Sequence, residues 1–99
     1  MLNIQKTIEN EAAVVSLEGR LDTVTAPELE KTLQELLPGL TALTLDFAKL
    51  DYISSAGLRV LLSAQKVMNK QGSMTITHVN DAITEIFDIT GFSDILTVS

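Results

Sequence analysis

The stretch D-Y-I-S-S-A-G-L, residues 51–58, places two adjacent serines between an apolar segment and a helix-like one. Before it, apolar and polar residues alternate over residues 43–47, and a period of two predicts a β-strand. After it, apolar residues recur at helical spacing from Leu58 to Met68, and Gly72 ends that run. The stretch is therefore a strand-to-helix corner. Serines at such a corner could cap the helix, attack a substrate or accept a phosphate.

The same patterns predict the other elements on both sides of this corner. In chain order we expect a strand over residues 2–8, a turn at 9–11, a strand over 12–18 stopped by Gly19, a helix from Thr25 to Pro38-Gly39, a strand over 74–77, a helix from Asn80 or Asp81 to Gly91, and a last short strand within 94–98. Thr25 and Glu28 have the spacing of a capping box, which predicts that the Thr25 side chain caps its helix.

This order, ββαβαβα with an optional last strand, predicts an α/β fold. The first two strands form a hairpin, whereas the strand–helix–strand units require parallel pairing, so we expect a small open mixed sheet of four to five strands. Each strand is apolar on one face only, which places the helices mainly on one face of the sheet. The 99 residues are expected to form a single domain, 1–99. The loops at residues 19–25 and 51–58 should meet at the edge where the parallel strands end, and open α/β sheets carry their sites there.

Composition argues against several classes of function. No cysteine is present, and the single histidine and scattered carboxylates supply no metal-ligand cluster, so we expect no metal and no cofactor. A net charge of −6 disfavours direct nucleic-acid binding. No apolar run is long enough for membrane insertion and no signal peptide is evident, so we expect a cytoplasmic protein.

A serine hydrolase is also disfavoured. The nucleophile-elbow pattern G-x-S-x-G fails because Ile53 stands where the first glycine would precede Ser55. By strand parity, His78 is expected on the helix-covered face near the same sheet edge, so geometry alone does not exclude it as a partner of the serine. Helix capping by Ser54 or Ser55 would contribute about 1 kcal/mol. Capping does not explain the small pair Ala56-Gly57, which would leave a hydroxyl open to a large docking partner.

The run D-Y-I-S-S-A-G-L-R-V-L-L, together with the early loop G-R-L-D-T-V-T-A-P-E-L, resembles the STAS domain family, the bacterial anti-sigma-factor antagonists. The resemblance covers essentially the whole chain. It implies a non-enzymatic protein that binds an anti-sigma factor with serine kinase activity and so liberates a sigma factor. It also implies that the kinase phosphorylates one serine, that the complex then dissociates, and that a PP2C-type phosphatase resets the cycle. The phosphorylated serine lies two residues before the family's glycine, which corresponds to Ser55 here.

The resemblance implies that Asp22 engages the partner. Together with their neighbours at the two loops, the expected partner-binding residues are Asp22, Thr23, Ser54, Ser55, Ala56, Gly57 and Arg59. Ser54 departs from the pattern, because well-studied members often carry aspartate there. Arg59, one turn into the helix, could pair with a phosphate, steer an acidic partner or simply remain solvated. A phosphate at the helix start is favoured by about 0.3–1 kcal/mol, so we expect phosphorylation to block docking without remodelling the domain. The alternative is an accessory subunit of a membrane lipid ABC transporter, docked on its ATPase, or another STAS-based signalling scaffold.

Overall fold

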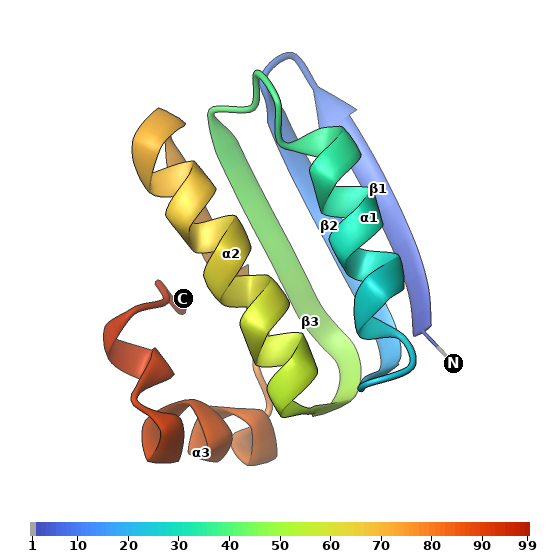
Figure 1. Ribbon diagram of the computed structural model, residues 1–99, viewed down its shortest axis with the longest axis vertical. Helices are drawn as coiled ribbons and strands as arrows, with labels where there is room; N and C mark the ends of the chain where they lie inside the picture. The colour runs from blue at the N-terminus through green and yellow to red at the C-terminus, as the bar shows by residue number, and fades with distance from the viewer. Residues whose placement is uncertain (1) are drawn as a thin grey trace.

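The computed structural model describes residues 2–99 and contains a four-stranded sheet in the order β1-β2-β3-β4. Figure 1 shows β1, β2 and β3 side by side in this sheet. The elements are β1 (Leu2–Glu9), β2 (Ala12–Leu21), α1 (Ala26–Leu36), β3 (Ala42–Ile53), α2 (Ser55–Gln71), β4 (Ser73–Thr77), α3 (Asp81–Thr90) and the 3₁₀ helix η1 (Phe92–Asp94). β1 pairs antiparallel with β2, and β2, β3 and β4 are parallel. The expected α/β fold, with an open mixed sheet and ββαβαβα order, is confirmed.

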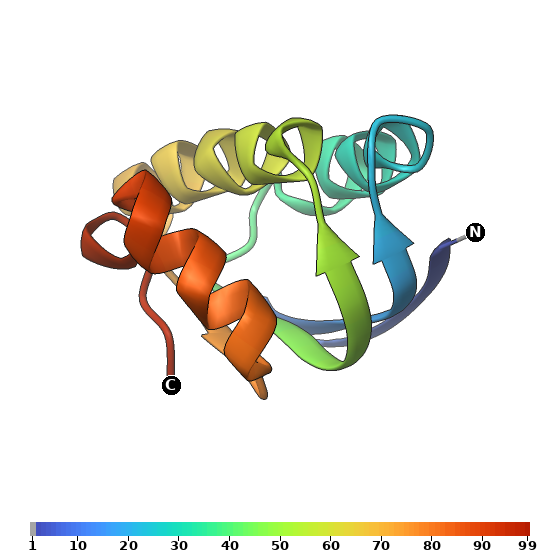
Figure 2. The same cartoon turned by 90° about the horizontal axis from the view of Figure 1, so that it is seen from below.

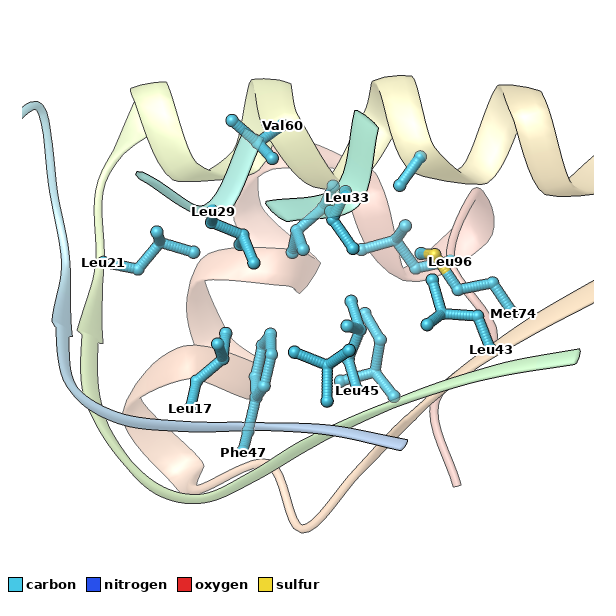
Figure 3. Packing of buried hydrophobic residues seen from close by; sticks show 14 of the residues in the cluster. Leu17, Leu21, Leu29, Leu33, Leu43, Leu45, Phe47, Val60, Met74 and Leu96 are labelled. Carbon is cyan, nitrogen blue, oxygen red and sulfur yellow. The ribbon is translucent and has the colours of Figure 1, made fainter. Parts of the chain in front are cut away.

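The helices α1 and α2 lie side by side over one face of the sheet, as Figures 1 and 2 both show. Alternate residues of the two central strands point toward these helices and are buried, among them Leu17, Leu45 and Phe47. Leu29 and Leu33 of α1 meet them from the helix layer (Figure 3). Each such side chain contributes about 1.5–3 kcal/mol when fully buried, so this layer supplies most of the driving force for folding.

The two central strands are longer than the sequence pattern predicts. Gly19 does not stop β2, which continues to Leu21, and β3 continues past Phe47 to Ile53. Their pairing shifts register between Ser16 and Glu18 and again at Gly19, where the backbone adopts φ +106. Such irregularities bend a strand and break the apolar alternation without ending it. Figure 2 shows the result, since the ends of both strands curve toward the helices.

The tail after α3 forms less regular structure than a strand. Residues 92–94 form η1, and a single parallel bridge then joins Val98 to Ile76 of β4. Two hydrogen bonds hold this bridge, from Ile76 N to Thr97 O and from Ser99 N to Ile76 O, each at 2.9 Å. The expected last strand is thus reduced to one bridge beside β4.

Candidate functional site

The ends of β2 and β3 bring the two loops of interest together. Leu21 is paired with Ile53 in the sheet, and Ser54 N donates to Leu21 O at 2.8 Å. The residues that follow each strand, 22–25 and 54–57, therefore begin side by side. The expectation that these loops meet at one sheet edge is confirmed, although the strands that deliver them are longer than predicted.

Asp22 organises the first loop through its carboxylate. Its Oδ1 accepts hydrogen bonds from Val24 N at 3.0 Å and Thr25 N at 3.1 Å. The Thr25 amide, more than any other group, lowers the pKa of Asp22 below its usual value of 3.8, and the Thr25 hydroxyl, the Val24 amide and the Arg20 charge act in the same direction. Asp22 is therefore ionised at neutral pH and locked into the loop.

The predicted capping box at Thr25 and Glu28 is wrong. Thr25 is the residue before α1, but its side chain makes no capping hydrogen bond. The hydroxyl instead donates to Arg20 O and accepts from Asp22 N, both at 2.8 Å. The Thr25 side chain is buried, and its hydrogen bonds hold the loop to the end of β2. Its spacing to Glu28 resembles a capping box because sequence spacing cannot reveal which backbone groups a hydroxyl will meet.

Arg20 and Tyr52 form a contact that the sequence did not suggest. They are paired across β2 and β3, and the Arg20 guanidinium carbon lies 4.3 Å from the centre of the Tyr52 ring. Arg20 Nε also lies 3.9 Å from Asp22 Oδ2. The cation thus connects an aromatic ring on β3 to the carboxylate that shapes the first loop.

The two serines of the corner have different roles in the fold. Ser54 is the N-cap of α2, with extended backbone, and its Oγ accepts from Gly57 N at 3.4 Å. Ser55 is the first residue of α2 and is exposed, and within residues 2–99 its side chain makes no hydrogen bond. Capping is thus confirmed for Ser54, which leaves the Ser55 hydroxyl available at the start of a helix.

The other expected partner-binding residues differ in accessibility. Gly57 is buried under the strand ends, so it shapes the corner from within rather than presenting a surface. Ala56 is half-buried, and Thr23 and Arg59 are exposed. Thr23, Ala56 and Arg59 line a hollow of about 210 Å³ between the first turns of α1 and α2. The walls of this hollow also include Ala26, Pro27, Glu30, Val60 and Ser63.

Val24 is a surface residue that the sequence reasoning missed. It stands at the tip of the first loop and is 82% exposed, the largest exposed fraction among the large apolar side chains of residues 2–99. Asp22 and Thr25, on either side of it in the loop, are joined by hydrogen bonds, and the Val24 amide itself donates to Asp22 Oδ1. An exposed valine on a loop held by hydrogen bonds, which begins beside residues 54–57, is a suitable anchor for a docking partner. The sequence signal was an apolar residue in a polar loop.

His78 does not join this site, and its expected position on the helix-covered face is wrong. It follows β4 with a left-handed backbone, φ +58, and its Nδ1 lies 3.0 Å from Asp46 Oδ1. Asp46 alternates with the buried Leu45 and Phe47, so the pair lies on the face without helices. Among residues 2–99, no group of three or more His, Asp or Glu side chains is placed to hold a metal ion, and no helix has the length and apolarity to cross a membrane.

The fold and this corner define a STAS domain. Residues 4–97 match the family model of the Mlab STAS domain, and the chain belongs to the STAS domain family. The anti-sigma-B factor antagonist of Staphylococcus aureus is 31% identical over 100 residues, which cover 99% of this chain and 93% of that protein. BtrV of Bordetella bronchiseptica, whose name likewise refers to an anti-sigma factor antagonist, is 36% identical over 88 residues, covering 87% of this chain and 76% of BtrV.

A solved structure supports the fold independently. The crystal structure of an anti-sigma factor antagonist from Mycobacterium paratuberculosis superposes with a TM-score of 0.89 at 22% identity, covering 99% of this chain and 85% of that one. At this identity the likeness concerns the fold alone. This chain therefore shares its fold with that protein, and the resemblance to the STAS domain family seen in the sequence is confirmed.

Proposed function

We propose that the chain, acting as one domain over residues 1–99, is a cytoplasmic anti-sigma-factor antagonist. It binds an anti-sigma factor with serine kinase activity, releases a sigma factor and is switched off by phosphorylation at Ser55. The observation that carries this proposal is the exposed Ser55 hydroxyl at the first residue of α2, beside the loop fixed by Asp22. The names of the two curated relatives support the class of partner.

The chemistry at Ser55 favours phosphate transfer over hydrolysis. Within residues 2–99 its hydroxyl has no hydrogen bond to a base, and the one histidine of the chain pairs with Asp46 on the other face of the sheet. A kinase supplies its own catalytic base, so the acceptor serine needs only to be accessible. We therefore propose that the chain is a phosphate acceptor and not an enzyme, and that a PP2C-type phosphatase restores the free hydroxyl.

The docking surface consists of two parts that meet at Ser55. The first loop contributes the ionised Asp22, Thr23 and the exposed Val24, and the corner contributes Ser55 and Ala56. Arg59 and the hollow beside it extend the surface along α2. Two further residues lie beneath this surface. Ser54 caps α2, and Gly57 packs against Leu21 and Ile53 and so sets the position of the start of α2.

Phosphorylation at Ser55 would act on the interface and leave the fold in place. The first amides of α2 favour an anion at this position by about 0.3–1 kcal/mol. A partner that covers the phosphate must desolvate a group of charge about −2, at a cost of several kcal/mol where no cation faces it. A loss of 3–4 kcal/mol is roughly a several-hundred-fold loss of affinity.

Phosphosite mapping tests the proposal. The purified chain is incubated with ATP and an anti-sigma-factor serine kinase from the same organism, and the product is analysed by mass spectrometry. One phosphate on Ser55 is expected, Ser55→Ala should accept none, and Ser54→Ala is the matched control that should still accept it. Transfer to Ser54, or no transfer at all to the wild type, would contradict the assignment.

A second candidate function is the transporter role that the family resemblance also implies, and it stays open because the matching family model is described by the name Mlab and not as an antagonist. In this alternative the same corner docks on the ATPase of a membrane lipid ABC transporter as an accessory subunit. Stable co-purification with a transporter ATPase, together with no phosphate transfer from any co-encoded kinase, would favour it. Binding to an anti-sigma factor in competition with its sigma factor would favour the antagonist.

A further inference from the structure

The outer face of α2 carries a line of positive charge that is unlike the rest of the molecule. The helix holds three of the seven basic residues of the chain, Arg59, Lys66 and Lys70, and none of its thirteen acidic residues. All three are exposed. None of them lies within 4.0 Å of a carboxylate in the part of the chain that the structure describes, residues 2–99.

Helix geometry places these cations in one row. At 3.6 residues per turn, positions 7 and 11 residues after Arg59 return to within about 20° of it, so Lys66 and Lys70 lie above it along the axis. The row is about 16 Å long between Arg59 and Lys70 at 1.5 Å per residue. Ser55 lies one turn before Arg59 and about 40° from the same line, at the end of the row nearest the candidate site.

The helix next to α2 has the opposite charge. α1 lies alongside α2 in both views (Figures 1 and 2), and its exposed side chains include Glu28, Glu30 and Glu35 against the single basic Lys31. Glu30 borders the same hollow as Arg59. The positive row therefore has a carboxylate beside its Arg59 end and an acidic helix next to it, in a chain whose net charge is −6.

This pattern fits a protein partner better than a lipid or nucleic-acid surface. A flat anionic membrane laid over α2 would also meet the carboxylates of α1, and an extended polyanion would be repelled by the rest of the chain. A partner helix or strand bearing a row of Asp and Glu can follow α2 without covering α1. Complementary charge of this kind raises association rates and fixes the register of docking.

We propose that the α2 row, Arg59, Lys66 and Lys70, extends the docking surface of Ser55 and receives an acidic surface of the partner protein. This inference rests on the proposed function for the identity of that partner. The row also explains why phosphorylation of Ser55 would weaken binding. A phosphate at the end of the row offsets part of the row's positive charge and faces the partner's carboxylates. The release caused by phosphorylation is then electrostatic, and it weakens as salt is added.

The test compares two double variants with equal changes in charge. Lys66→Gln with Lys70→Gln removes two charges from the row and keeps good helix formers, whereas Lys6→Gln with Lys49→Gln removes two exposed charges from β1 and β3. Binding to the anti-sigma-factor serine kinase that phosphorylates Ser55 is measured by calorimetry from low to high salt, after thermal unfolding shows that each variant folds. We expect the first pair to lose on the order of tenfold in affinity at low salt and to flatten the salt dependence, with the control pair near wild type. Equal binding by both pairs would overturn the inference and leave the proposed function standing.

A second measurement does not depend on the proposed function. Backbone amide signals of the chain are followed by NMR during titration with a short polyglutamate peptide at low salt. Shifts over residues 59–70 that disappear in Lys66→Gln with Lys70→Gln support the row as an acidic-protein site, and their absence overturns it. If the kinase does not bind the wild type, the proposed function fails and this titration alone decides the inference. Sedimentation with phosphatidylglycerol vesicles that the same variant abolishes would assign the row to a membrane and overturn the proposal.

Discussion

Gly57 of α2 packs directly against Leu21 at the end of β2. A Cβ atom at Gly57 would lie 2.7 Å from Leu21 Cγ and 2.8 Å from Ile53 Cγ1, closer than carbon atoms tolerate. Leu21 is fully buried and Ile53 nearly so, so neither side chain has free space to move into. The absence of a side chain at Gly57 therefore sets how closely the start of α2 approaches the two strand ends that carry the site.

Gly57→Ala should destabilise the chain by about 1–3 kcal/mol, the usual cost of overpacking a core. Helix propensity alone gives the opposite sign, because alanine is favoured over glycine in a helix by up to about 1 kcal/mol. The sign of the change in unfolding free energy, measured by urea denaturation, distinguishes the two effects. Ser55→Ala, at an exposed neighbour, is the matched control and should stay within about 0.5 kcal/mol of wild type. A stabilised Gly57→Ala would mean that the corner is looser than described.

The fold could be predicted because its signals are local and repeated. Alternation over residues 43–47 and leucines at helical spacing after Leu58 are set by which face each side chain buries, and the structure confirms both elements. Strand ends could not be predicted in the same way. The register shifts near Gly19 depend on the neighbouring strand, which the local pattern does not reveal, so β2 and β3 are longer than expected.

For the candidate site, the sequence identified the two loops but not how they are held. The S-S-A-G sequence predicted that one of its two serines caps the following helix, and in the structure Ser54 caps α2. The roles of Asp22 and Thr25 depend on which nearby backbone groups their side chains meet in the loop, and sequence spacing alone does not decide that. The role of Arg20 depends on a ring contact across two strands, which local spacing does not reveal. Val24 also escaped notice, because its importance lies in its exposure.

The contact between Arg20 and Tyr52 should have a measurable coupling energy. A double-mutant cycle with Arg20→Met, Tyr52→Leu and the double variant isolates the pair, and a cation above an exposed ring contributes about 0.5–1 kcal/mol. Unfolding free energies from urea denaturation give the four corners of the cycle. Strictly additive changes would show that the 4.3 Å approach has no energetic consequence.

Asp22 should make stability depend on acid pH. Its folded-state pKa lies below the usual 3.8, mainly because of the Thr25 amide. A depressed carboxyl pKa contributes stability that is fully present above the unfolded value and is lost as the pH falls through the folded one. The stability difference between wild type and Asp22→Asn should therefore be constant near neutral pH and decline below about pH 4. Thermal unfolding across this range measures it, and a difference that does not change with pH would show that the carboxylate is not held as described.

Phosphorylation at Ser55 should change the surface of the chain without rearranging its fold. Because Ser54 already caps α2 and Ser55 makes no side-chain hydrogen bond within residues 2–99, the phosphate replaces no structural contact. In amide NMR spectra of the free and phosphorylated chain, shifts should be confined to residues 54–59 and the adjoining loop 22–25. The phosphorylated chain should keep its melting temperature within a few degrees, in line with the roughly 0.3–1 kcal/mol that a helix start gives an anion.

The chain phosphorylated at Ser55 should bind the anti-sigma factor several hundred-fold more weakly than the unphosphorylated chain, which corresponds to a loss of about 3–4 kcal/mol in binding free energy. Phosphatase treatment is the matched control, because it returns the identical chain to the free form and should restore affinity. Shifts spread through β1 and α3 would indicate a rearranged domain and contradict a switch confined to the surface. Unchanged affinity of the phosphorylated chain would remove Ser55 from the interface altogether.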